Sequence, residues 1–423
     1  MSSLRARADD PGSTAPERRI DEVRAAAAAV FEQRGYSGTT MALIADEIGV
    51  LPGSLYHHFR SKEEIAVAIL QRFEQDLGTA SVKPARAADA DPEQRLRLLM
   101  HEVVSLSLRN RAAVRLRVFE PPAVTTERLR DARRIHAPAL EQAWRTTVDD
   151  LARDRPDRAG DARLLRFAVK SLALDAGAQF PDDPDPSSIA GLLADLLLTG
   201  VAAGCPDDED LDRSDAVRAA DDAMATWPRR PATTAGSDVR GRIIAAARTA
   251  FARHGFEAAT IRDIAGLAEV RMATLYRRVE SKEAILADVV AGFSTDLGRA
   301  VRAALTHGDC PAASLDALAK VLTRARRGFR EESDIMRFGY ALDSHAAPLR
   351  AYAAETDDRL RLLEGVLADG MARGSLRRLA EPQAAARQVR VCLWLPYQDF
   401  GRTSERRAHA FLRRTLLRGF VNG

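Results

Sequence analysis

The sequence predicts an all-α protein made of two similar halves, and three observations lead to that prediction. The chain has 423 residues, which is too long for one hydrophobic core, because domains usually hold about 100 to 200 residues. Alanine runs such as residues 25–29 favour helix, since alanine loses no side-chain entropy when a helix forms. A segment near the N-terminus also recurs in the second half of the chain.

The recurring segment aligns residues 19–70 with residues 239–290 without a gap. The composition can account for the matching alanines, but not for two longer matches in the same register. These are Leu55-Tyr56 with Leu275-Tyr276 and Ser61-Lys62-Glu63 with Ser281-Lys282-Glu283. Self-similarity at a fixed register indicates a repeated structural module, so each half is expected to begin with the same fold.

The first copy of the module begins with a predicted helix over Arg19–Arg34. Its apolar residues recur at helical spacing, and Gly35 ends it, since glycine readily adopts the left-handed conformation that follows a helix. Either Thr39 or Thr40 is placed to cap a second helix, Met41–Ile48, with its side-chain oxygen.

The rest of the module consists of a turn and two more helices. Gly49 supplies a sharp turn, and a third helix is predicted over Pro52–Phe59, where proline fits the first turn because its missing N–H is not needed there. Ser61 and Glu64 then form a capping box that starts a fourth helix. Two short helices joined by a tight turn are the helix-turn-helix plan.

The module closely resembles the DNA-binding domain of the TetR family of transcriptional regulators. In the first copy the matching positions are Gly35, Tyr36, Thr39, Thr40, Ile44, Ala45, Gly49, Val50, Ser54, Leu55, Tyr56, His57, His58, Phe59, Ser61, Lys62 and Glu63. In the second copy they are Gly255, Phe256, Thr260, Ile264, Ala265, Val270, Thr274, Leu275, Tyr276, Ser281, Lys282 and Glu283. The resemblance implies two TetR-like units, each with an N-terminal three-helix DNA-binding domain and a helical regulatory domain.

The resemblance also implies which residues contact DNA. In a helix-turn-helix the second helix lies in the major groove and its first residues reach the base edges. The residues in this position are Leu51, Pro52, Gly53, Ser54, His57 and His58 in the first copy and Arg271, Met272, Ala273, Thr274 and Arg277 in the second. Helix starts suit a phosphate, because backbone N–H groups and nearby positive charge attract it. The residues at such starts are Thr40, Lys62, Thr260 and Lys282.

Two pairs of residues in the module have alternative interpretations. In the family the tyrosine that matches Tyr56 and Tyr276 lies against the DNA backbone, but these side chains can instead be packing residues. His57 and His58 do not indicate a metal site, because adjacent residues on a helix point in different directions.

The second copy differs from the first at positions that matter for DNA binding. Glu269 replaces the turn glycine, Val279 replaces an aromatic residue, and Glu280 adds an acid near the expected DNA backbone. Arg271, by contrast, can donate two hydrogen bonds to guanine, which is worth about 1 to 3 kcal/mol of discrimination. The two modules are therefore not expected to read the same half-site, and the predicted partner is a non-palindromic double-stranded operator.

The segments after each module are predicted to be amphipathic helices. They cover residues 92–118, 125–153, 161–178 and 187–203 in the first half and 311–329, 333–343, 346–373, 382–398 and 404–421 in the second. In the resembling family the last two helices form a dimer bundle and the middle helices enclose a ligand. We therefore expect an intrachain pseudo-dimer through a four-helix bundle, with a dimer of two chains as the alternative.

Aromatic residues in these segments are candidates for a pocket that holds a small apolar effector. They are Phe119, Trp144, Phe167, Phe338, Tyr340, Trp394 and Tyr397. Aromatic residues at helical spacing are more often core than ligand cage, and aromatics make up only 5% of the chain. Packing in the hydrophobic core is therefore the alternative interpretation of these residues.

The expected domain boundaries follow from these elements. They are a disordered tail (1–15), the first DNA-binding domain (16–75) and regulatory domain (76–226), a linker (227–238), and the second DNA-binding domain (239–295) and regulatory domain (296–423). An acidic run over residues 207–222 ends the first half, and arginines over residues 402–418 end the second. Opposite charges can steer the halves together, although a solvated acidic face is an equal alternative.

The sequence offers nothing that predicts catalysis, a cofactor or a metal. It has no phosphate-binding glycine loop, nucleophile elbow or zinc-protease motif, and Cys205, Cys310 and Cys392 are too far apart for a C-x-x-C site. No apolar run reaches the roughly 20 residues that span a bilayer, so a cytoplasmic location is expected. The leading hypothesis is a ligand-responsive repressor, and the alternative is a constitutive or architectural DNA-binding protein whose second half serves as a built-in dimerisation partner.

Overall fold

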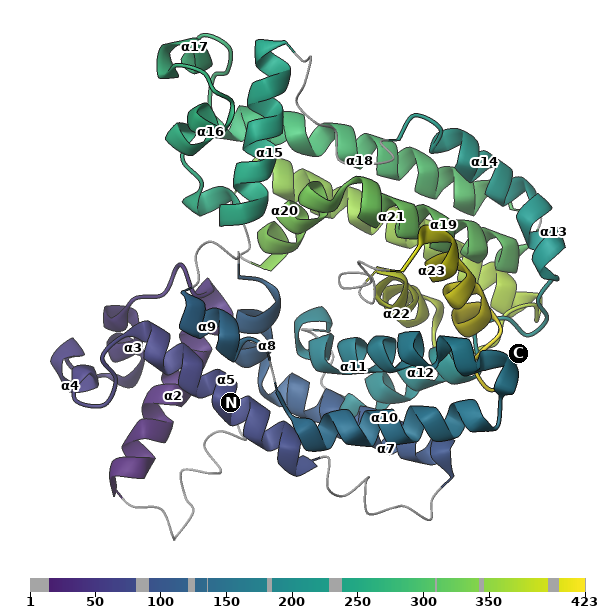
Figure 1. Ribbon diagram of the computed structural model, residues 1–423, viewed down its shortest axis with the longest axis horizontal. Helices are drawn as coiled ribbons and strands as arrows, with labels where there is room; N and C mark the ends of the chain where they lie inside the picture. Colours follow the sequence, from purple (N-terminus) through teal and green to yellow (C-terminus); the bar gives the residue numbers. More distant parts are fainter. Residues whose placement is uncertain are drawn as a thin grey trace. The chain divides into compact units, whose positions relative to one another are not determined.

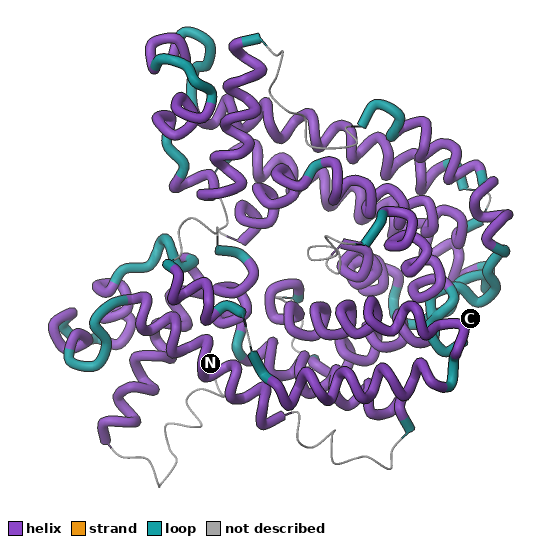
Figure 2. The backbone as a smooth tube through the Cα atoms, viewed as in Figure 1, coloured by secondary structure: helices purple, strands orange, loops and turns teal. Residues whose placement is uncertain are grey.

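The computed structural model describes residues 15–80, 91–120, 126–134, 136–180, 185–227, 238–308, 310–341, 346–394 and 403–422. Within these ranges the regular structure is helical (Figures 1 and 2), apart from an isolated bridge between Ala202 and Leu376. The all-α prediction is confirmed. The expected tail before Ala15 and most of the expected linker, residues 228–237, lie outside the described residues.

The chain forms two compact units, one of residues 1–146 and 173–187 and the other of residues 147–172 and 188–423. This division differs from a cut between the two sequence halves, because the end of the first half packs with the second half. The helices from the first module to the point where the units divide are α2 (Ala15–Arg34), α3 (Met41–Ile48), α4 (Pro52–Tyr56), α5 (Lys62–Ala80), α7 (Pro92–Arg109), α8 (Arg111–Val118), α9 (Glu127–Ala132), α10 (Pro138–Arg153), η2 (Pro156–Asp161) and α11 (Ala162–Gln179).

The remaining helices are placed in the second unit almost entirely. They are α12 (Pro186–Leu198), α13 (Asp208–Arg213), α14 (Asp215–Ala223), α15 (Val239–Ala258), α16 (Ile261–Leu267), α17 (Met272–Tyr276), α18 (Lys282–Thr306), α19 (Pro311–Gly328), α20 (Arg330–Ala341), α21 (Ala347–Ala372), α22 (Pro382–Trp394), α23 (Glu405–Leu412) and the π-helical turn η4 (Arg413–Leu417). The long helices α18 and α21 lie side by side (Figure 1).

Helix α14 connects the first half of the chain to the core of the second unit. It packs against α18 and α19, and Trp227, which follows it, is buried with its ring 5.2 Å from that of Phe329 in an edge-on arrangement. The stack continues from Phe329 to Phe293 and on to Tyr352. Trp227 was expected to begin a linker, but its ring is part of a hydrophobic core, which ties down the chain just before the second module.

The ends of α12 and η4 meet through their backbones in a reciprocal arrangement, here called the helix-end crossing (residues 197–202 and 416–421). The N–H groups of Phe420 and Val421 donate to the carbonyls of Leu197 and Leu198 at 2.9 Å. In return, the N–H groups of Val201 and Ala202 donate to the carbonyls of Leu416 and Leu417 at 2.8 and 2.9 Å. The two segments have similar sequences, Leu-Leu-Thr-Gly-Val and Leu-Leu-Arg-Gly-Phe. Each donates to and accepts from equivalent positions of the other, which is the pattern of an interface related by a two-fold axis.

Glycine makes the helix-end crossing possible at both central positions. Gly200 and Gly419 have φ values of +73° and +87°, which glycine adopts at no steric cost. A Cβ on Gly200 would lie 2.4 Å from the backbone nitrogen of Gly419, and a Cβ on Gly419 would lie 2.3 Å from the carbonyl carbon of Thr199. The two backbones are therefore too close for any side chain at either position.

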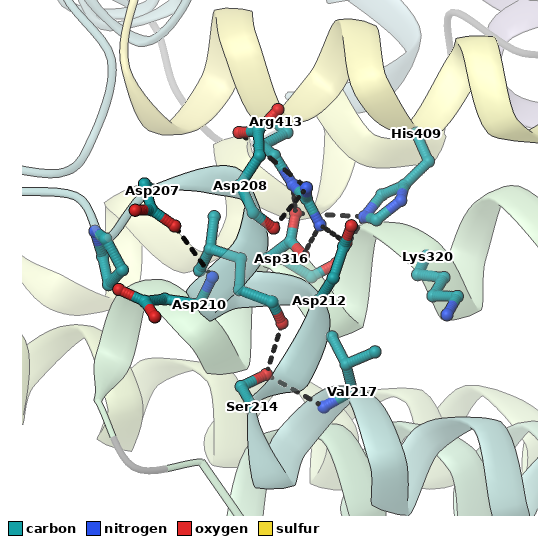
Figure 3. Close-up of polar contacts among 12 residues, drawn as sticks. Asp207, Asp208, Asp210, Asp212, Ser214, Val217, Asp316, Lys320, His409 and Arg413 are labelled. Carbon is teal, nitrogen blue, oxygen red and sulfur yellow. Dashed lines mark hydrogen bonds and ion pairs between the residues drawn. The ribbon is translucent and has the colours of Figure 1, made fainter.

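A buried ion-pair cluster lies in the same unit (Figure 3). The Asp316 carboxylate on α19 has no exposed surface and accepts hydrogen bonds from Arg413 Nε at 2.9 Å, Arg413 Nη2 at 2.7 Å and His409 Nε2 at 3.0 Å. Arg413 Nη2 also donates to Asp212 on α13 at 2.6 Å. Burial on its own would raise the pKa of Asp316, but the hydrogen bonds and charges of His409 and Arg413 lower it to about 2.

Further arginines near the C-terminus pair with acidic groups from the first half. Arg414 donates to both oxygens of the buried Asp161 at 2.7 and 2.8 Å, and Arg418 pairs with Asp208 at 2.6 Å. Asp208 and Asp212 of the acidic run are thus paired with C-terminal arginines, although both side chains remain more than half exposed. Within the part of the chain that the structure describes, no helix combines the length and apolar character needed to cross a bilayer.

Candidate DNA interface

One face of α4 in the first module is exposed to solvent, and the other packs on the module's core. Leu51 precedes the helix in an extended conformation with Pro52 in the first turn, and Leu55 and Phe59 are buried beneath it. Two large side chains face the other way, since 79% of Leu51 and 54% of Tyr56 is exposed. Exposed apolar side chains gathered on one element indicate a contact surface.

The remaining predicted contacts of the first module lie around α4. Pro52, Gly53 and Ser54 are exposed, and a Cβ on Gly53 would meet no atom within 4 Å, so this backbone is open to a partner. The sequence predicted that this helix ends at Phe59, but it ends at Tyr56, and His57 follows as its C-cap. His57 is exposed and His58 is half-buried.

The local signals that start and stop α3 are present as predicted. The Thr40 side chain accepts a hydrogen bond from the Leu43 N–H at 3.2 Å, which settles the choice between Thr39 and Thr40 as the cap. Thr39 is buried and donates to the Gly35 carbonyl at 2.7 Å. Gly49 ends the helix in the left-handed conformation with φ +78°, so the turn between α3 and α4 has the geometry that glycine favours.

The second module exposes a more basic set of side chains around α17. Arg271 occupies the N-cap position of the helix. The exposed residues here are Arg271, Met272, Ala273, Arg277 and Arg278. Tyr276 is 62% exposed, as its counterpart is in the first module. Thr274 is half-buried and accepts from Arg277 Nη2 at 3.4 Å. The hydroxyl of Thr260 is already hydrogen bonded to Asp263 in a capping box.

Two substitutions in the second module have different structural results. Val279 is buried, as Phe59 is in the first module, so the smaller residue still closes the core. Glu269 takes the place of Gly49 with φ +54°, and a non-glycine residue in this region carries about 1 to 3 kcal/mol of strain.

Replacing Glu269 with glycine is expected to stabilise the second unit by about 1 kcal/mol, because the strained turn relaxes. Urea denaturation measures the change. The matched control is Gly49→Ala in the first module, which puts a Cβ on the equivalent turn and is expected to destabilise its unit by a similar amount. An unchanged or lower midpoint for Glu269→Gly would contradict the strain.

Lys62 and Lys282 have a structural role that the sequence analysis missed. Lys62 Nζ donates to the carbonyls of Tyr36 and Thr39 at 2.8 and 2.9 Å and lies 4.5 Å from the centre of the Tyr36 ring. Lys282 Nζ donates to the carbonyls of Phe256, Glu257 and Ala259, also 4.5 Å from an aromatic ring. Each lysine therefore holds the turn before the second helix of its module. A phosphate contact by either lysine stays a prediction.

The first module is tied to its regulatory part by a carboxylate that sequence reasoning did not single out. Glu120, just after α8, is buried and accepts a hydrogen bond from the Tyr36 N–H at 2.7 Å. Burial raises the pKa of Glu120, against the effects of this hydrogen bond and of the Arg133, Lys62 and Arg115 charges. Burial, with the charges of Glu63 and Glu120, also raises the pKa of Tyr36 to about 12.

The second module is tied to its regulatory part by other residues. Arg248 on α15 pairs with Glu331 at 3.0 Å and with Glu332 at 3.2 Å, both on α20. Thr249 donates to Glu331 at 2.8 Å. The first copy has Ala28 and Ala29 at the positions of Arg248 and Thr249, and alanine cannot make these contacts. Alignment of the two copies reveals this difference from the sequence alone.

The candidate pocket residues fall into two groups. Phe119 and Trp144 are buried and Phe167 and Trp394 are half-buried. The Trp144 Nε1 has no hydrogen-bond partner among the described residues. The side chains of Phe338, Tyr340 and Tyr397 lie outside the described residues. A ligand-binding role for these residues stays a prediction.

Comparison with known proteins shows that both modules match the same protein family. Residues 23–69 and 243–289 each match the model for bacterial regulatory proteins of the tetR family. The transcriptional activator FasR of Mycolicibacterium smegmatis is 29% identical over 40% of this chain and 75% of its own length. The nucleoid occlusion factor SlmA of Vibrio campbellii is 30% identical over 39% of this chain and 80% of its own length.

A solved structure is also similar to part of the chain. The ketosteroid transcriptional regulator KstR2 of Mycobacterium tuberculosis is 21% identical, with a TM-score of 0.38 over 44% of this chain and 93% of that one. Like the two curated relatives, it has about the length of one half of the chain.

Proposed function

The chain is a tandem member of the tetR family of bacterial DNA-binding transcriptional regulators, and on that premise we propose that it is a ligand-responsive repressor with two non-equivalent recognition helices. The observation that carries the DNA-binding part of this proposal is the pair of exposed tyrosines, Tyr56 and Tyr276, each the last residue of a recognition helix. Around them the side chains differ, with Leu51, His57 and His58 in one module and Arg271, Arg277 and Arg278 in the other.

The difference between the modules supports a non-palindromic operator. An arginine at the start of α17 is suited to guanine, with two acceptors in the major groove. The first module offers Leu51 at that position, and an apolar side chain favours contact with a thymine methyl group. We propose that the two half-sites differ in sequence accordingly.

The helix-end crossing supports the proposal that one chain acts as an intrachain pseudo-dimer. Its reciprocal hydrogen bonds have the pattern of an isologous interface, but both partners come from one polypeptide. We propose that a small apolar effector acts on the regulatory helices and changes the operator affinity. In the alternative, a constitutive or architectural DNA-binding protein, the chain does not respond to an effector and its second half serves mainly as a built-in dimerisation partner.

Replacing Tyr56 with alanine is expected to weaken binding to an operator about tenfold, because the side chain loses its contact with the DNA backbone. The operator is selected from a random duplex pool with the unmodified chain, and affinity and footprint are then measured over a range of salt concentrations. Binding should weaken steeply as salt rises, since phosphate contacts release counterions.

The matched control is Leu98→Ala, which removes another exposed apolar side chain, on α7 outside the modules. It should leave the affinity unchanged. Equal affinity of Tyr56→Ala and the unmodified chain would refute the proposed contact. A pool that yields no preferred sequence would favour the architectural alternative.

A further inference from the structure

The turn between α2 and α3 is held from two sides by side chains that come from different parts of the chain. Glu120 accepts from the Tyr36 N–H at 2.7 Å, and Lys62 donates to the Tyr36 carbonyl at 2.8 Å on the other side of the same residue. Lys62 belongs to the module itself, but Glu120 follows α8 and belongs to the regulatory part. Tyr36 is therefore a point where the regulatory part reaches the module through a polar contact.

The turn is directly connected to the recognition helix. Lys62 also holds the Thr39 carbonyl, Thr40 caps the next helix, α3, and α3 packs against α4. A displacement at Tyr36 consequently moves the cap of α3, and with it the helix that carries the proposed base contacts.

The backbone of Glu120 is held by a second element. Arg133, at the end of α9, donates to the carbonyls of Arg117 and Glu120 at 2.8 and 2.9 Å. The end of α8 and the end of α9 are thus held together around Glu120. Phe119, one of the pocket candidates, is its immediate neighbour and is buried. A rearrangement of α8 against α9 would move the Glu120 carboxylate.

We infer that Glu120 is a positioning residue for DNA binding by the first module, acting through Tyr36, and that the second module is positioned separately through Glu331 and Arg248. This inference rests on the proposed function. Because Ala28 and Ala29 occupy the positions of Arg248 and Thr249, the first module cannot make the contacts that hold the second. A signal in one regulatory part therefore reaches its own recognition helix at a different point, the turn in one case and the first helix in the other.

The test uses the full chain and the duplex that it selects from a random pool. Glu120→Ala is expected to lose about tenfold in affinity, within the usual range for coupling between sites. Protection in the footprint should weaken only over the half-site of the first module, where Tyr56→Ala is also expected to weaken it. Arg248→Ala should affect the other half-site. Glu120→Gln keeps an acceptor oxygen for the Tyr36 N–H and should bind within about threefold of the unmodified chain.

The control is Glu127→Gln, which removes an exposed carboxylate from the first turn of α9. Hydrogen exchange without DNA gives an independent readout, since residues 35–40 should exchange faster in Glu120→Ala and not in the control. If Glu120→Ala does not fold, Glu120→Asp replaces it, because the shorter side chain withdraws the carboxylate from Tyr36.

Two outcomes would overturn the inference and leave the proposed function intact. One is a footprint and exchange pattern for Glu120→Ala equal to that of the control. The other is an equal loss over both half-sites, which would indicate a general structural role. By contrast, failure of the unmodified chain to select any duplex would count against the proposed function itself.

Discussion

Replacing Gly200 with alanine is expected to destabilise the second unit by at least about 2 kcal/mol. The new Cβ would lie 2.4 Å from the Gly419 nitrogen and from the Leu417 carbonyl oxygen, and both are backbone atoms that cannot rotate away. The left-handed conformation adds about 1 kcal/mol or more of strain, and overpacking typically adds 1 to 3 kcal/mol. Gly419→Ala should have a similar effect, since it meets the backbone of Thr199.

Gly374 provides a control that separates these two costs. Its φ of +71° is almost the same as that of Gly200, but a Cβ there would meet nothing within 4 Å. Gly374→Ala is expected to cost only about 1 kcal/mol, from strain alone. Urea denaturation measures both variants, and hydrogen exchange at residues 197–202 and 416–421 reports the crossing directly. Equal costs for Gly200→Ala and Gly374→Ala would show that the two backbones are not in tight contact.

Replacing Asp316 with alanine is expected to cost about 3 to 5 kcal/mol, because it leaves the buried Arg413 without its main partner. Asp212→Ala is the matched control, since it removes the other short contact of Arg413. Its side chain is 66% exposed, and an exposed ion pair contributes about 0 to 1 kcal/mol. Similar urea midpoints for the two variants would contradict the prediction that the buried Asp316 stabilises the fold more than the exposed Asp212.

The Asp316 cluster also predicts a dependence of stability on pH. The pKa of Asp316 is lowered from 3.8 to about 2 in the folded chain. The folded state therefore holds the proton less tightly than the unfolded state, and the pair contributes about 2 kcal/mol above pH 4. That contribution is lost as the pH falls from about 4 to about 2. Asp316→Asn should unfold with a flatter pH dependence in this window, and an unchanged slope would contradict it.

The parts of the structure that depend on neighbouring residues could be predicted from the sequence. Met41–Ile48 is helical as expected, because Thr40 and Gly49 supply the start and stop signals within the helix's own length. The third helix was predicted too long: it ends at Tyr56, with His57 as its C-cap. In the second module the sequence indicated a lost turn glycine but not its consequence, since only the backbone shows that Glu269 keeps the left-handed conformation.

The contacts between distant residues could not be predicted in this way. Lysine at a helix start suggested a phosphate, yet the partners of Lys62 are carbonyls more than twenty residues earlier. The matching strings around Gly200 and Gly419 are short, and nothing in either string tells which backbone will pack against it. Trp227 stood among prolines and arginines that indicated a linker, but its burial depends on Phe329.

The helix-end crossing has a consequence for how the protein responds to its own abundance. Subunits that must meet in solution separate on dilution, so the occupied fraction of their target varies with the square of their concentration when they are scarce. Here the two partners are joined by the chain, and their effective concentration is set by that connection. In the proposed pseudo-dimer, assembly would therefore not depend on the expression level, and the occupied fraction of the operator would follow the first power of the number of molecules. Because different stretches of the same coding sequence specify the two partners, a point mutation changes only one of them.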